Sequence, residues 1–151
     1  MAGAFPAGRT LLMRNSRVPL TSLEADWVMM VAIAATLADG MIDPAESVRL
    51  RMLAYLNPMY REVSSVEEYI RLCARAVKTR GPWSVGRRAA RVLPQALCEL
   101  AYACAAEMIY AGKGIHPSEH EFLSHLRKEL KIPGELAGKI NAVSAIRSRS
   151  G

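Results

Sequence analysis

Three carboxylates lie close together in the first third of the chain, where they could bind a metal ion. Asp39, Asp43 and Glu46 fall within eight residues, and carboxylate oxygens are the ligands that hard divalent cations prefer. Their spacing also matches the second half of a calcium-binding EF-hand loop. The first two ligand positions of such a loop would be Ala35 and Leu37, which cannot bind a metal. The sequence therefore excludes an EF-hand but leaves open a site for calcium, magnesium or zinc.

The same carboxylates also have a purely structural interpretation. Asp43, Pro44 and Glu46 are typical of a capping box, in which two acidic side chains accept backbone N–H groups at the first turn of a helix. Asp39 ends the preceding apolar run, where a negative charge opposes the helix dipole by roughly 0.3–1 kcal/mol. We expect either N–H groups at the start of the next helix or a cation to stabilise the Asp39 carboxylate.

A weaker group of candidate metal ligands contains His116 and Glu119. Together with His120 they form the H-x-x-E-H pattern of one class of zinc peptidases. That chemistry needs both imidazoles on one face of a helix and a third ligand, whereas Pro117 places His116 at the cap, outside the helix. The sequence also contains no P-loop, dinucleotide motif or local nucleophilic triad. We therefore predict that the protein is not an enzyme.

A stretch without acidic residues separates Glu68 from Glu99 and could form a docking surface. Within it, Arg71, Arg75 and Lys78 recur at the spacing of one helical face. Such a face could bind an acidic protein partner or an anionic membrane surface, although charged stretches are also typical of solvated helices. No nucleic-acid motif is present, which argues against sequence-specific nucleic-acid binding. The candidate partner-binding residues are Arg71, Arg75, Lys78, Arg87, Arg88 and Arg91.

The elements that must position these residues are helices. The chain has 151 residues, of which 51% are hydrophobic and 6% aromatic. This is the size of one domain, and the abundance of Ala, Leu and Met favours helices over strands. The net charge of +6 permits contacts with anions. The three cysteines form no close pair, and no apolar run could act as a signal peptide or span a bilayer, so we expect a cytoplasmic protein with buried free thiols.

Capping residues, glycines and prolines divide the chain into about seven helices. We expect a flexible basic arm over residues 1–20, a helical domain over 21–146 and a frayed tail over 147–151. The second helix should have one broad apolar face that includes Val48 and Leu56, and the methionines should fill the core. The expected helices begin near Thr21, Asp43, Ser64, Ser84, Pro94, His116 and Pro133.

An internal repeat relates the two halves of this domain. Residues 37–46 align with residues 110–119, and the isoleucine, proline and glutamate of the first segment recur at the same positions in the second. Each segment follows an Ala-rich apolar helix and precedes an amphipathic one. The agreement predicts two pseudo-symmetric helix-turn-helix halves in a single all-α bundle.

The first of these segments resembles a known family signature. The motif Ala38-Asp39-Gly40-x-Ile42-Asp43-x-x-Glu46 is similar to that of TerB-like (tellurite-resistance protein B) domains, and the resemblance covers about residues 25–143. It implies a non-enzymatic binding or adaptor module in tellurite resistance or a stress response, with a possible cation at the acidic turn. The second segment departs from the signature because Gly112-Lys113 stands where the family has Asp-Gly, and His116 stands where it has a second acid. The alternative is an ion-independent interaction bundle that docks acidic partners or an anionic surface through residues 71–91.

Overall fold

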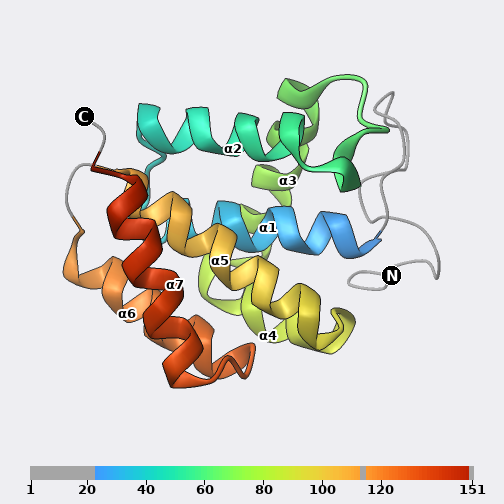
Figure 1. Cartoon of the computed structure of the whole chain (residues 1–151). Coiled ribbons are helices and arrows are strands. Elements are labelled where there is room, and N and C mark those ends of the chain that lie inside the picture. Colours follow the sequence, from blue (N-terminus) through green and yellow to red (C-terminus); the bar gives the residue numbers. More distant parts are fainter. Residues whose placement is uncertain (1–22, 113–114, 150–151) are drawn as a thin grey trace.

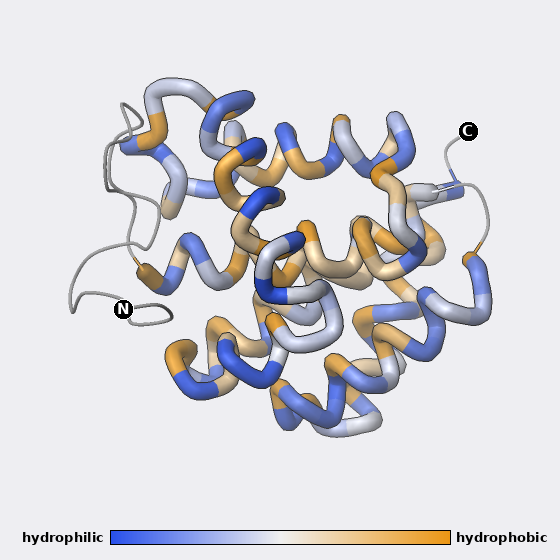
Figure 2. Tube along the Cα trace, turned by 180° about the vertical axis from the view of Figure 1, so that it is seen from behind, coloured by the Kyte–Doolittle hydropathy of each residue, from blue (hydrophilic) through white to orange (hydrophobic). Residues whose placement is uncertain are grey.

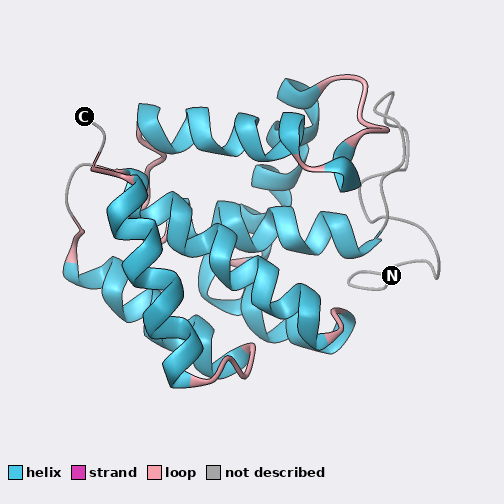
Figure 3. Cartoon of the chain, viewed as in Figure 1, coloured by secondary structure: helices cyan, strands magenta, loops and turns pink. Residues whose placement is uncertain are grey.

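The computed structural model describes residues 23–112 and 115–149, and this part of the chain is all-α, without a strand (Figures 1 and 3). The expected arm, Thr21 and the end of the expected tail lie outside the described residues. The single helical bundle with about seven helices is confirmed. Its elements are α1 (Leu23–Leu37), α2 (Pro44–Leu56), a 3₁₀ turn (Pro58–Tyr60), α3 (Val66–Arg80), α4 (Pro82–Val92), α5 (Gln95–Ala111), α6 (Pro117–Glu129) and α7 (Gly134–Arg147).

Helix α1 forms the centre of the bundle, as its apolar sequence indicates. Every residue from Ala25 to Leu37 is buried, because α1 packs against α5, α4 and α3 on different sides. Helix α5 in turn packs against α2, α6 and α7. Figure 1 shows α7 in front of α5, whereas α3 and α4 lie behind α1. Hydrophobic and hydrophilic residues alternate along the outer helices, as expected of amphipathic helices on a core (Figure 2).

Most helix boundaries agree with the capping signals, and the differences have local causes. Helix α3 begins one residue later than expected, because Ser65 rather than Ser64 accepts the cap hydrogen bond from the N–H of Glu68, at 3.3 Å. Helix α4 begins at Pro82 rather than Ser84, since the Ser84 hydroxyl donates back to the carbonyl of Arg80, at 2.7 Å. Helix α7 includes Arg147, which was expected in the frayed tail.

The core contains the expected free thiols but only some of the expected methionines. Cys73, Cys98 and Cys104 are buried free thiols that form no disulfide with one another. Burial raises the pKa of the Cys104 thiol to about 12. Met29, Met30 and Met108 are also buried. The expectation was wrong for Met41 and Met52, which are 73% and 46% exposed. These two methionines therefore belong to the surface.

Candidate functional site

The two turns of the internal repeat form equivalent helix starts. At the first turn, the N–H of Asp43 donates to Glu46 Oε1 at 2.9 Å, and the N–H of Glu46 donates to Asp43 Oδ1 at 3.1 Å. The expected capping box of α2 is thus confirmed. At the second turn, the N–H of His116 donates to Glu119 Oε1, also at 2.9 Å. In both turns a proline follows the cap residue, and a glutamate closes over it.

The two capping glutamates are buried near each other. Glu46 is 2% exposed and Glu119 is 3% exposed. The pKa of Glu46 is raised to about 7, mainly by burial and also by the negative charges of Asp43, Glu119 and Asp39. The backbone N–H of Asp43 opposes this rise but does not cancel it. The fold therefore brings the two turns together and concentrates carboxylates around Glu46.

Gly112, which ends α5, lies against the acidic side chains of the first turn. A Cβ atom built on Gly112 would lie 3.1 Å from Asp43 Oδ2 and 3.6 Å from Glu46 Oε2. These are the two carboxylate oxygens that the capping box does not use. The φ angle of Gly112 is −73°, which any residue can adopt. Glycine is therefore needed here for the close approach of Asp43 and Glu46, not for its backbone conformation.

Asp39 is not part of the capping box, although its charge contributes to the raised pKa of Glu46. Its Oδ1 accepts the N–H of Met41 at 3.2 Å within its own exposed turn. Of the two alternatives expected for this carboxylate, bonds to N–H groups at the start of α2 are not formed, and a cation stays a prediction. Among the described residues, no three His, Cys, Asp or Glu side chains are grouped so that they could hold a metal ion. Metal binding by Asp39, Asp43 and Glu46 stays a prediction.

The histidines of the second half point to structural roles. His116 is an exposed cap residue and His120 is exposed on α6, while Glu119 is engaged by the cap. The His125 ring lies 3.3 Å from the Trp83 carbonyl and 3.2 Å from the Glu129 carboxylate. His125 thereby links α6 to the start of α4. The weaker candidate ligands His116 and Glu119 are accounted for by helix capping.

The predicted partner-binding residues lie on α3 and α4, which pack side by side. Arg71, Arg75, Lys78, Arg87 and Arg91 are exposed and Arg88 is half-buried; we call these six residues the basic face. Arg71 pairs with Glu68 at 2.6 Å. The other exposed members, Arg75, Lys78, Arg87 and Arg91, form no ion pair with any described residue.

Cationic side chains of α3 and α4 come close to each other at one point of the basic face. The Arg80 guanidinium lies 5.2 Å from the centre of the Trp27 ring, an arrangement in which the ring attracts the cation. The pKa of Arg80 is lowered by burial and by the positive charge of Arg88. Helices α3 and α4 therefore bring their cationic residues close enough to repel one another.

Sequence reasoning missed one apolar surface. Val48 and Leu56 are 46% and 72% exposed, so the expectation that both join a single buried face of α2 was wrong. Leu50 and Ala54 form the buried side of this helix instead. The broad apolar pattern of α2 could have indicated this surface, because a helix that is apolar on two sides has more than one surface to cover.

Comparison with family models, curated proteins and solved structures finds no match to this chain. The relation to TerB-like domains thus stays a prediction from the motif and the repeat. In residues 23–112 and 115–149, every helix is too short or too polar to cross a bilayer.

Proposed function

We propose that this chain is a non-enzymatic binding module that docks an acidic protein surface through the basic face. The observation that carries the proposal is that four exposed cations on these two packed helices, Arg75, Lys78, Arg87 and Arg91, form no ion pair with any described residue. An acidic partner could neutralise Arg75, Lys78, Arg87 and Arg91 without breaking an existing ion pair. The positive charge of the chain would also speed the encounter.

The composition of the basic face favours a protein over a membrane. Helices that lie on membranes insert apolar side chains between the lipids. The apolar residues of α3, such as Tyr69, Cys73 and Val77, are buried in the core. Of the exposed large hydrophobic residues in the described chain, only Trp83 belongs to α3 or α4. This surface therefore offers charged side chains but no row of exposed apolar side chains that could insert into a membrane.

Charge reversal tests this function. The probe is a fluorescein-labelled polyglutamate peptide, and binding is followed by fluorescence anisotropy at two salt concentrations. We expect the double variant Arg75→Glu, Arg87→Glu to bind at least about tenfold more weakly. The matched control is Lys128→Glu, Arg149→Glu, which makes the same change in net charge on exposed residues that are not members of the basic face. Equal losses in both variants, or stronger binding to phosphatidylserine vesicles than to the peptide, would contradict the proposal.

Binding of a divalent cation where the two turns meet is a second candidate function. It is favoured by one observation, namely that Asp43 Oδ2 and Glu46 Oε2 both approach Gly112. A cation there would offset the charge that collects around Glu46. If it binds only the folded chain, the melting temperature must rise with its concentration. An unchanged melting temperature in calcium, magnesium and zinc, after treatment with a chelator, would remove this candidate.

The TerB-like resemblance connects either kind of binding to tellurite resistance or a stress response. It is supported by the equivalence of the two turns, each with a proline and a buried glutamate, Glu46 or Glu119. Growth on tellurite tests the link in a strain that lacks the gene for this chain. The parent gene should restore growth, and the Arg75→Glu, Arg87→Glu variant should not. Restoration by both genes would separate tellurite resistance from the basic face.

A further inference from the structure

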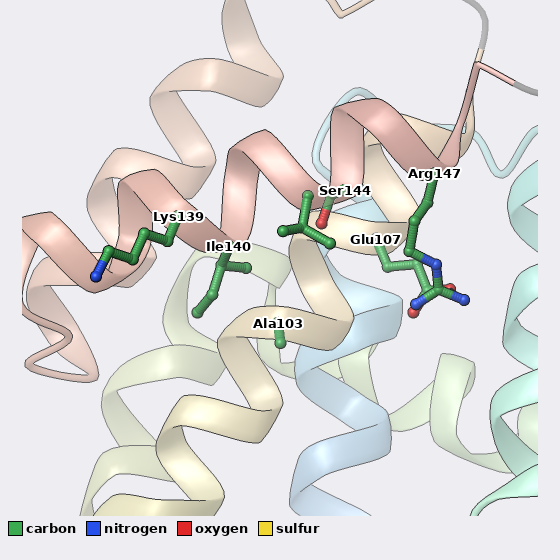
Figure 4. Close-up of a pocket in the computed structure, with 7 residues that line it drawn as sticks. Ala103, Glu107, Lys139, Ile140, Ser144 and Arg147 are labelled. Atoms are coloured by element: carbon green, nitrogen blue, oxygen red, sulfur yellow. The ribbon is translucent and has the colours of Figure 1, made fainter.

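A groove lies between α2 and α7, because one hollow is lined by residues of both helices and of α5. Both helices pack against α5, which forms its floor. Two hollows of about 290 and 310 Å³ adjoin along it and share Glu107 and Arg147 in their linings. Figure 4 shows Arg147 reaching from α7 toward Glu107 on α5. The shared residues indicate one continuous surface.

Both walls of this groove include exposed apolar side chains. In the described chain eight large hydrophobic residues are exposed, and all except Trp83 belong to α2, the turn before it or α7. Three of them line the two hollows: Met52 and Leu56, which are one turn apart on α2, and Val143 on α7. Such a concentration of exposed apolar side chains marks an interaction site. The remaining four, which line neither hollow, are Met41, Val48, Tyr55 and Ile146.

The polar groups of the groove carry an excess of positive charge. Arg49 lies 2.9 Å and Arg147 lies 3.9 Å from the single carboxylate, that of Glu107. Lys139 adds a third cation at the other end. The Arg147 side chain is 64% exposed, so it can contact a ligand while it remains near Glu107. An occupant must therefore supply acidic groups as well as apolar ones.

We infer that this groove binds an acidic amphipathic helix of another protein. An amphipathic helix lays its apolar face into such a groove, where Met52, Leu56 and Val143 can contact it. Its acidic flank would pair with Arg147 and Lys139, and its apolar face would cover Met52 and Val143. A second copy of this chain would bring another net charge of +6, which opposes self-association. The inference goes beyond the proposed function, because it assigns a separate surface and a defined helical ligand.

Two designed peptides test the inference. Both carry the same leucine stripe at helical spacing, and the flanking positions are all glutamate in one and all lysine in the other. We expect the chain to bind the glutamate peptide at least about tenfold more tightly, as measured by fluorescence anisotropy. The double variant Met52→Asp, Val143→Asp should lose this binding. Because both residues are exposed, circular dichroism should show an unchanged fold.

The basic-face variant Arg75→Glu, Arg87→Glu provides the matched control, which should bind the glutamate peptide within about twofold of the parent. This separates failure of the groove from failure of the proposed function. Three results would overturn the inference: no preference for the glutamate peptide, equal loss in the control, or a dimer in light scattering that Leu56→Asp dissociates. Tighter peptide binding after removal of residues 1–22 would overturn it too, because the chain itself would then compete for the groove.

Discussion

Glu46 and Glu119 occupy equivalent positions in the two halves of the bundle and lie near each other in its interior. Each is the third residue of its helix, and each accepts the N–H of the cap residue at 2.9 Å. Both are almost fully buried, and the charge of Glu119 contributes to the raised pKa of Glu46. The internal repeat thus places two acidic groups in one poorly hydrated region, where they repel each other.

The raised pKa of Glu46 makes the stability of the fold depend on pH. Glu46 has a pKa of about 7 in the folded chain, compared with an ordinary value of 4.5. Between these values the unfolded chain loses the proton first, so the contribution of Glu46 becomes less favourable as pH rises, by roughly 1–3 kcal/mol above pH 7. The variant Glu46→Gln keeps a hydrogen-bond acceptor without the charge. Its melting temperature relative to the parent should therefore be higher at about pH 8 than at about pH 4.

The exposed residue Glu62 offers the control for this measurement. The variant Glu62→Gln removes the same charge from a solvated site, so the difference from the parent should change little between the two pH values. The prediction would be contradicted if Glu46→Gln were less stable than the parent by the same amount at both pH values. Ionisation of Glu46 would then not lower the free energy of unfolding.

A methyl group on Gly112 should disturb the first turn of the repeat. In the variant Gly112→Ala the new Cβ would lie 3.1 Å from Asp43 Oδ2, which forces a small shift and should cost about 1 kcal/mol. If the two nearby oxygens bind a cation, the melting-temperature rise with that cation should disappear as well. Urea unfolding with and without the cation measures both effects.

Gly138 in α7 is the matched control for this substitution. A Cβ atom there would have no neighbour within 4 Å, so Gly138→Ala should stabilise the chain by roughly 0.5–1 kcal/mol through helix propensity. A full cation effect in Gly112→Ala would contradict the proposed role of Asp43 and Glu46 as ligands.

The features that could be predicted from sequence are those that depend on neighbouring residues. The capping box of Asp43 and Glu46 was predicted correctly, because its hydrogen bonds join groups three residues apart. The start of α3 was displaced by one residue because Ser64 and Ser65 have the same capping chemistry. The central position of α1 followed from its apolar residues on all sides.

The features that were missed depend on contacts between distant parts of the chain. Nothing local indicates that Gly112 approaches Asp43, since this contact arises only when the start of α2 packs against the end of α5. The apolar pattern of α2 likewise does not say which side faces the core. Leu50 turned out to be buried and Leu56 exposed. The groove therefore depends on the packing of both α2 and α7 against α5, which local sequence does not indicate.

The contact between α4 and α6 should depend on the small size of Gly86. A Cβ atom on Gly86 would lie 2.5 Å from Glu129 Oε1 and 2.7 Å from Leu126 Cδ1. Leu126 is buried, so it cannot move freely, and Gly86→Ala should destabilise the chain by roughly 1–3 kcal/mol in urea unfolding. Gly138→Ala again provides the comparison. Equal stability changes in the two variants would show that α4 and α6 can separate at little cost.

The hydrogen bond from Tyr69 to Asp26 should contribute more to stability than the similar bond made by Tyr60. The Tyr69 hydroxyl donates to the buried carboxylate of Asp26 at 2.6 Å, and the Tyr60 hydroxyl donates to the carbonyl of Ala25 at 2.9 Å. Both rings are buried, so Phe in either place preserves the packing. A charged acceptor loses more when its donor is removed, so we expect costs of roughly 1.5–3 kcal/mol for Tyr69→Phe and 0.5–1.5 kcal/mol for Tyr60→Phe.

Urea unfolding of the two tyrosine variants measures the difference, and a third variant tests its cause. In an Asp26→Asn background the acceptor is neutral, so Tyr69→Phe should then cost about as much as Tyr60→Phe. If the cost of Tyr69→Phe stays the same in both backgrounds, the charge of Asp26 is not what the hydroxyl stabilises. The hydroxyl would then stabilise a neutral acceptor as much as a charged one, because the ring, which packs 5.8 Å from that of Tyr60, is kept in the Phe variant.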